Sequence, residues 1–141
     1  MMKKLPIILC LLPFLFLSNM VIGQDNEGMH YGAKETFTYW AGEEPWEGIE
    51  VKHGQYWSSA HFSKEYIMYM EVIVPKSTAL NFINDSHNKL ELAGDGVDLP
   101  DGAPDWFTPP KSFKVYTREW QGSMYFIDTN TGHMFMYEVQ L

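Results

Sequence analysis

The run EYIMYMEVIV, residues 65–74, constrains the fold more than any other stretch of the sequence. It is rich in aromatic and β-branched residues, which favour extended backbone. Side chains alternate between the two faces of a strand, and here both faces are mostly apolar. Because both faces need to be covered, the run predicts a central strand of a sheet. Pro75 marks its end.

The next segment, STALNFINDSHN (residues 77–88), predicts a helix of about three turns. Ser77 is suited to the N-cap position because its hydroxyl can accept a hydrogen bond from a free amide of the first turn. Leu80, Ile83, His87 and Leu90 then follow at helical spacing, beside Phe82. The helix is expected to stop near Asn88, and His87 is expected to pack at the edge of the core.

The C-terminal third predicts a three-stranded meander formed by residues 113–120, 123–128 and 133–141. The connections are short enough for hairpins, and Gly132 can adopt the positive φ of a bulged turn. Residues 36–40, TFTYW, have the composition of an earlier strand, whereas residues 49–62 are ambiguous between a strand pair and irregular structure.

Together these elements predict an α+β fold in the order β-α-β-β-β, with one or two further strands before it. The expected architecture is an antiparallel sheet of about four to five strands with one main helix packed on one face. Residues 35–141 are expected to form this single domain, and residues 24–34 a flexible lead-in.

The N-terminus has the three-part layout of a secretory signal, predicted here for residues 1–23. Lys3 and Lys4 precede an uncharged apolar run of residues 5–17, which is shorter than the ~20 residues that span a bilayer. We therefore expect export to the periplasm or the extracellular space. The alternative is an uncleaved segment that anchors the chain to a membrane.

The only cysteine, Cys10, lies inside the predicted signal, so the exported chain is expected to have no disulfide and no thiol chemistry. The whole chain has a net charge of −8, and removal of the signal with its two lysines makes it −10. Such acidity argues against nucleic acid or an anionic membrane surface as the partner. It also keeps a protein soluble.

The segment GDGVDLPDGAPDWFTPP, residues 94–110, contains four aspartates and four prolines. The spacing of its aspartates does not match a calcium-binding loop. It also lacks the lysine and the strand-to-helix context of a phosphate-binding loop. No histidine pair has metal-ligand spacing. We therefore expect no metal and no cofactor, and read the segment as a proline-stiffened crossing from the helix to the meander.

One short string, WSSAHFSKEY (residues 57–66), resembles an enzyme site in composition. A small hydrolase could use His61 as a base with Ser59 or Glu65. However, the chain has no G-x-S-x-G elbow and no recognisable oxyanion hole. A polar strand edge explains the same residues without any catalytic role.

Aromatic residues are the remaining feature, with 22 Phe, Trp and Tyr in the chain. Such residues dominate recognition surfaces and also fill cores. Trp106 and Phe107 either close the core or face a partner, and we favour closure with the aspartates left at the surface. The candidate binding surface consists of Trp106, Phe107, Asp105, Trp57 and His61.

These features favour a small exported binding protein without catalysis, of the inhibitor or immunity kind. Its expected partner is a protein or a glycan in the cell envelope or outside the cell. The alternatives are the small hydrolase described above and a carbohydrate-binding module that uses exposed tryptophans.

Overall fold

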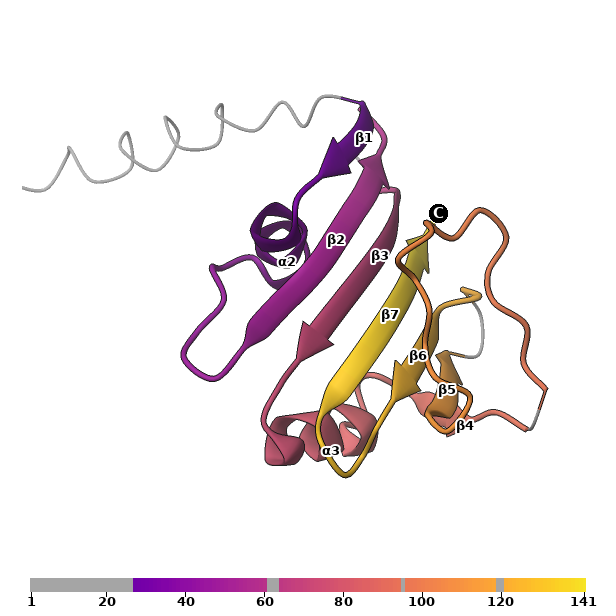
Figure 1. The fold of residues 1–141 in the computed structure, drawn as a ribbon. Helices are drawn as coiled ribbons and strands as arrows, with labels where there is room; N and C mark the ends of the chain where they lie inside the picture. The colour runs from indigo at the N-terminus through magenta and orange to yellow at the C-terminus, as the bar shows by residue number, and fades with distance from the viewer. Residues whose placement is uncertain (1–26, 61–63, 95, 119–120) are drawn as a thin grey trace, which may run out of the picture.

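The structure, a computed structural model, describes residues 27–60, 64–94, 96–118 and 121–141. Within these ranges the chain forms one antiparallel sheet of seven strands and two helices (Figure 1). The strands are ordered β1-β2-β3-β7-β6-β5-β4 across the sheet. The elements are β1 (Gly28–Tyr31), α2 (Ala33–Ala41), β2 (Glu50–Ser58), β3 (Tyr66–Ile73), α3 (Lys76–Asn84), β4 (Leu90–Leu92), β5 (Lys114–Arg118), β6 (Met124–Ile127) and β7 (His133–Gln140).

The α+β class is confirmed, but the expected number of elements was too small. The described sheet has seven strands where about four to five were predicted, and two helices where one was predicted. The C-terminal meander is present as β5, β6 and β7. The central position of β3 is also confirmed, because β3 lies between β2 and β7 with Tyr66 opposite Gln140.

The prediction of a strand at residues 36–40 was wrong, because these residues belong to α2. Their aromatic and threonine content favours a strand, but Phe37 and Trp40 lie one helical turn apart and both pack on the sheet. Burial of this helical face outweighs the weak local preference. The helix ends at Gly42, which adopts the left-handed conformation and donates its N–H to Thr38 O over 2.9 Å.

Helix α3 begins one residue earlier and ends four residues earlier than predicted. Pro75 occupies the N-cap position in place of Ser77, and the side chain of Ser77 makes no capping bond. The helix stops because Asp85 adopts an extended conformation and accepts the backbone N–H of His87 over 2.9 Å. This local turn competes with helix continuation, and it leaves His87 exposed and not at the edge of the core. No helix in the described part of the chain is long and apolar enough to cross a membrane.

Three strands lie where the sequence predicted no definite strand. Residues 28–31, in the expected lead-in, form β1 and pair with the end of β2 from Gly28–Ser58 to Tyr31–Gln55. The ambiguous stretch after residue 49 forms the long strand β2. The short strand β4 pairs with β5 at the opposite edge of the sheet.

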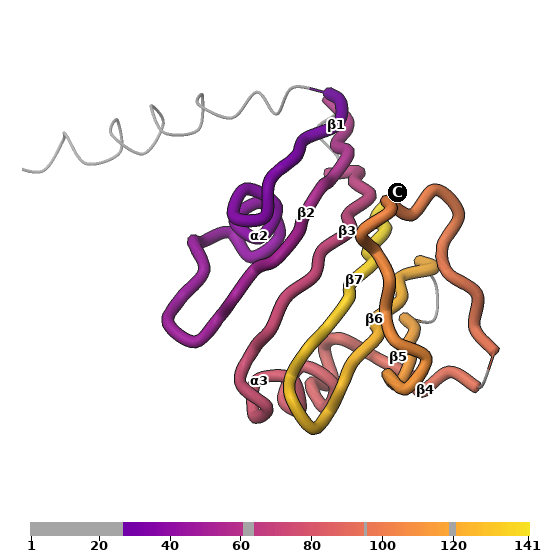
Figure 2. The backbone as a smooth tube through the Cα atoms, in the orientation of Figure 1, coloured from indigo at the N-terminus to yellow at the C-terminus, as the bar shows by residue number. Residues whose placement is uncertain are grey.

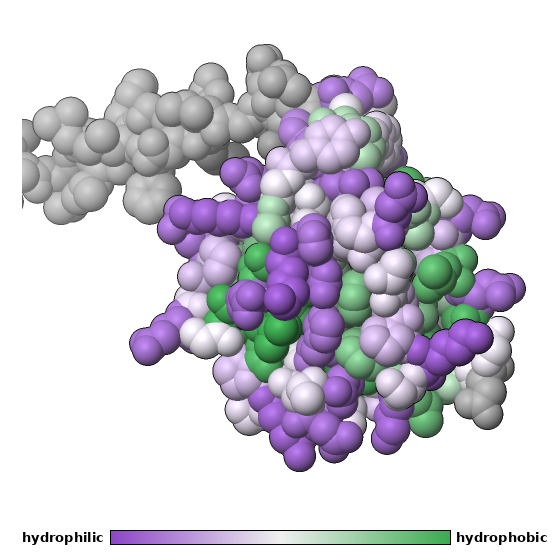
Figure 3. All heavy atoms as spheres, viewed as in Figure 1, coloured by the Kyte–Doolittle hydropathy of each residue, from purple (hydrophilic) through white to green (hydrophobic). Residues whose placement is uncertain are grey.

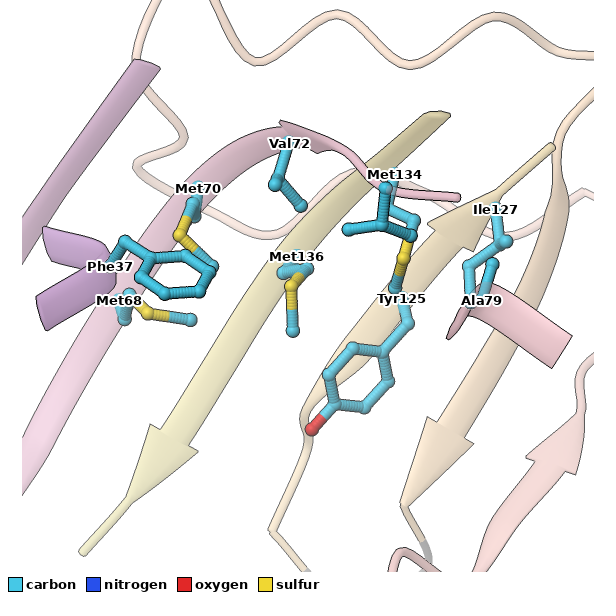
Figure 4. Packing of buried hydrophobic residues seen from close by; sticks show 10 residues of the cluster. Phe37, Met68, Met70, Val72, Ala79, Tyr125, Ile127, Met134 and Met136 are labelled. Carbon is cyan, nitrogen blue, oxygen red and sulfur yellow. The ribbon is translucent and has the colours of Figure 1, made fainter. Parts of the chain in front are cut away.

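The sheet has a different cover on each side (Figure 2). Both helices pack on one side, here called the helix face, over a core in which methionines of β3 and β7 are prominent (Figure 4). The irregular segment of residues 93–113 crosses the other side, here called the loop face. Its described residues contain only turns and bends, as predicted, and Asp98, Asp101 and Asp105 are exposed.

The turn between β6 and β7 depends on Gly132. This residue has φ +81°, and its N–H donates to Asp128 O over 2.8 Å. Its carbonyl accepts the N–H of Val74 over 3.0 Å, so the turn is also tied to the end of β3. A Cβ atom at position 132 would lie 2.0 Å from the Val74 carbonyl oxygen. The position therefore requires glycine for its conformation and for the close approach of two backbones.

Candidate functional site

Phe107, one of the predicted binding residues, closes the core of the loop face. Its side chain is 1% exposed. Four rings meet it edge-on: those of Tyr69, Phe126 and Phe135 at centroid distances of 5.3, 5.9 and 5.5 Å, and that of Trp106 at 6.0 Å. Such edge-to-face contacts add to the burial of apolar area. The expectation that Phe107 packs inward is confirmed, while the neighbouring Asp105 is exposed.

Trp106 is half-buried and connects the crossing segment to the sheet. Its indole stacks on the imidazole of His53, with centroids 5.1 Å apart and an angle of 15° between the planes. His53 belongs to β2, so the contact joins residues that are far apart in the sequence. One face of the indole is therefore occupied by the protein's own imidazole.

A cluster that the sequence did not predict lies beside this stack, where Glu71 links two histidines. Its Oε2 accepts His53 Nδ1–H over 2.7 Å, and its Oε1 accepts His133 Nε2–H over 2.8 Å. Glu71 is 8% exposed, whereas the side chain of His53 is half exposed. The sheet register brings them together, because His53 lies opposite Glu71 and His133 lies opposite Ile73.

These two hydrogen bonds determine which nitrogens stay free, namely His53 Nε2 and His133 Nδ1. Each lies on the ring side away from the carboxylate, so the three groups are not arranged around one ion. No group of three or more His, Cys, Asp or Glu in the described part of the chain is placed to hold a metal ion. Glu71 could have been noticed in the sequence, because a charge inside an apolar strand needs polar partners.

The enzyme-like string of residues 57–66 is only partly described. His61 lies outside the described residues. Ser59 is buried, and its backbone N–H donates to Glu65 O over 3.0 Å, which closes the connection between β2 and β3. Trp57 is half-buried, opposite Met29 in β1 and Ile67 in β3. The side chain of Trp57 is thus part of the sheet surface near its β1 edge.

A second buried carboxylate, Glu138, lies on the helix face and is 5% exposed. Three donors surround it: Trp40 Nε1–H at 3.1 Å, Tyr125 O–H at 2.8 Å, and the hydroxyl of Tyr66. Burial and then the negative charge of Glu138 raise the pKa of Tyr66 and of Tyr125. The two phenols therefore remain neutral donors, and Glu138 holds the indole of Trp40 in one orientation.

Trp40 forms part of an apolar pocket on the helix face, here called the inter-helix pocket. It encloses about 50 Å³. Phe37 and Trp40 come from α2, Phe82 and Thr78 from α3, and Trp46 and Ile49 from the loop between α2 and β2. Side chains of the core, including Val72 and Met136, complete the lining. The sequence did not predict this pocket because residues 36–40 were expected to form a strand.

The segment of residues 42–50 (GEEPWEGIE) lies beside the pocket and comprises the loop between α2 and β2 together with the first residue of β2. It is here called the acidic loop. It contains four glutamates and no lysine or arginine. Glu44 pairs with Lys34 over 3.0 Å, and Glu50 pairs with Lys52 over 3.3 Å. All four glutamates are exposed, and Trp46 in the same loop is 46% exposed. Exposed carboxylates therefore flank an indole that lines an apolar pocket.

Figure 1 views the molecule from the side that the segment of residues 93–113 crosses. Figure 3, in the orientation of Figure 1, shows mainly polar side chains with smaller apolar patches between them.

Comparison of the chain with protein-family models, with curated proteins and with solved structures found no match. A function for this chain is therefore argued from its own site geometry.

Proposed function

We propose that the protein is a non-catalytic binding protein of the inhibitor or immunity kind, and that it recognises a protein partner through the inter-helix pocket. The observation that carries the proposal is an apolar pocket with two tryptophans in its wall and an acidic loop at its side. Aromatic side chains around a pocket are typical anchoring points of protein interfaces. Concave apolar surface of this kind is also the usual form of a binding site.

The walls of the pocket are held in place before any partner binds. The indole N–H of Trp40 donates a hydrogen bond to the Glu138 carboxylate. The ring of Phe37 meets those of Trp40 and Trp46 edge-on, with ring centroids 5.9 and 5.4 Å apart. The ring of Trp40 also meets that of Phe82 in α3 edge-on, with ring centroids 6.4 Å apart. A wall that is already ordered loses little conformational entropy on binding, which favours affinity.

Three polar groups suited to catalysis are engaged in the described part of the fold. Glu71 accepts from two histidines and Glu138 from three donors, and Ser59 is buried. These bonds support a structural role for the two carboxylates. The glycan alternative receives less support, because the indole of Trp106 stacks on His53 and is not a free platform. Export through the segment of residues 1–23 stays a prediction.

The proposal can be tested with a small apolar probe, isobutanol, added to the full chain. Nuclear magnetic resonance signals of the five tryptophan side chains report where the probe binds. We expect shifts for Trp40 and Trp46, and none for Trp106. The variant Thr78→Leu, which extends an apolar side chain into the pocket, should abolish these shifts. Shifts centred on Trp106, or a hydrolase activity that is lost in His61→Ala, would contradict the proposal.

A further inference from the structure

We infer that the inter-helix pocket receives one branched aliphatic side chain from a basic segment of a partner protein. This inference rests on the proposed function and names the chemistry of the partner. Two independent properties carry it: the size of the pocket, which limits the group that enters, and the charge of the acidic loop, which selects the residues beside that group.

The size of the pocket favours a group smaller than an aromatic ring. A cavity of about 150 Å³ binds benzene, whereas this pocket encloses about 50 Å³. The end of a leucine or isoleucine side chain is closer to the available space. Apart from the two indoles, Thr78 is the only lining residue with a side-chain N or O atom, and the Trp40 N–H already donates to Glu138. A polar group that entered would thus lose hydration and gain few partners. A branched aliphatic group is thus the best match.

The acidic loop selects positive charge next to the aliphatic group. Glu43 lies three residues before Trp46, and Glu47 directly follows it. Within the described residues neither carboxylate forms an ion pair, in contrast to Glu44 and Glu50. A lysine or arginine beside the inserted side chain would complement these two carboxylates, which flank the lining residue Trp46 in the sequence. Complementary charge of this kind steers association and orients the partner.

The same charges argue against a second copy of this chain as the occupant. The chain has a net charge of −8, so two copies would repel one another overall. Like charges across an interface disfavour association. A basic segment of a different protein is therefore the occupant that size and charge together favour.

The test uses the full chain and a synthetic peptide, GKKLKKG with blocked ends, at low and fixed salt. Two comparison peptides replace the leucine by alanine (GKKAKKG) or the lysines by glutamates (GEELEEG). Binding is followed through the side-chain signal of Trp46. We expect the alanine peptide to bind about tenfold more weakly, because it buries less apolar area. We expect no binding of the glutamate peptide, and weaker binding of GKKLKKG at higher salt.

Variants of the protein separate the charge contribution from the pocket. The double variant Glu43→Gln with Glu47→Gln should weaken binding of GKKLKKG. The matched control, Glu91→Gln with Asp98→Asn, removes the same charge from exposed positions in β4 and the crossing segment. This control should bind as the wild type does. Thr78→Leu should block the peptide while the protein stays folded, as judged by its unfolding transition.

Each outcome has a distinct meaning. Equal binding of GKKLKKG and GKKAKKG would overturn the inference, because contact would then be electrostatic alone. Equal loss in the two double variants would overturn it as well. If isobutanol binds the pocket but no peptide does, the inference fails and the proposed function stands. If neither binds, both fail. A concentration-dependent shift of Trp46 without peptide would identify a second copy as the occupant and overturn the inference.

Discussion

Trp40 and Glu138 are hydrogen bonded across 98 positions of the sequence, with Nε1 and Oε2 separated by 3.1 Å. The bond connects α2 to β7, the strand in the middle of the sheet. The carboxylate is buried and also receives the hydroxyls of Tyr66 and Tyr125. One acidic side chain therefore organises a helix, three strands and a wall of the inter-helix pocket.

Replacement of Glu138 by Gln should destabilise the protein. The amide removes the charge that strengthens three hydrogen bonds, and its NH₂ group would face donors. We expect the free energy of unfolding to fall by about 2–3 kcal/mol. Urea denaturation measures this change, with Glu91→Gln at an exposed strand position as the control. Equal stability of the two variants would contradict the structural role of Glu138.

The buried tyrosines predict loss of stability at alkaline pH. Burial raises the pKa of Tyr69 to about 12 from its ordinary value of 10.0, and burial also raises the pKa of Tyr66 and Tyr125. Their contribution is complete below pH 10 and is lost as the pH rises through the folded-state values, because the unfolded chain ionises first. Each tyrosine adds up to ~1.4 kcal/mol per pH unit to this loss.

The variant Tyr69→Phe tests the assignment of this pH dependence. Unfolding curves recorded between pH 9 and pH 12 should show a smaller decline for Tyr69→Phe than for the wild type. Tyr31→Phe, at a position that is 71% exposed, serves as the control and should follow the wild type. A decline that is the same in all three proteins would mean that Tyr69 titrates normally in the folded state.

Gly132→Ala should be far more damaging than Gly102→Ala, although both residues have a positive φ. The values are +81° and +77°, so each alanine has a similar backbone penalty of about 1–2 kcal/mol. Only at position 132 would the added Cβ meet another backbone, 2.0 Å from Val74 O, whereas nothing lies within 4 Å at position 102. We expect Gly132→Ala to lower the unfolding free energy by at least about 2 kcal/mol more than Gly102→Ala. Similar thermal denaturation of the two variants would contradict the close approach.

Two substitutions of His53 distinguish its stacking from its hydrogen bond. His53→Phe keeps a ring against Trp106 and loses the N–H that Glu71 accepts, whereas His53→Ala loses both. We expect faster hydrogen exchange of the Phe107 amide, which donates to Pro104 O, in His53→Ala than in His53→Phe. Unchanged exchange in both variants would show that the crossing segment is held without His53.

The elements that the sequence predicted well are those whose pattern is local. The apolar run of β3 and the hairpins of the meander carry their own signal in alternation and turn residues. Helix α2 has no such local signal, because its threonines and aromatic residues favour a strand. The helix is stabilised by the packing of Phe37 on the sheet, which the sequence pattern does not show. Strand β1 is only four residues long and forms by pairing with β2, which no local pattern reveals.

The candidate site was predictable only in part. Phe107 follows a proline-rich segment whose backbone conformations are restricted. It was correctly expected in the core. The pairing of Glu71 with His53 and His133 requires the register of three strands, which the sequence does not specify. The inter-helix pocket requires the relative placement of two helices, one of which was expected to be a strand.

The position of β7 has a consequence for how the chain reaches its fold. This strand is the last described element in the sequence, yet it occupies the middle of the sheet and joins β1-β2-β3 to β6-β5-β4. Its partner β3 is more than 60 residues away, as in the pair Glu71–Phe135, so the central pairing closes a long loop. Long-range pairings of this kind slow folding. A nascent chain thus cannot complete this sheet until β7 has left the ribosome.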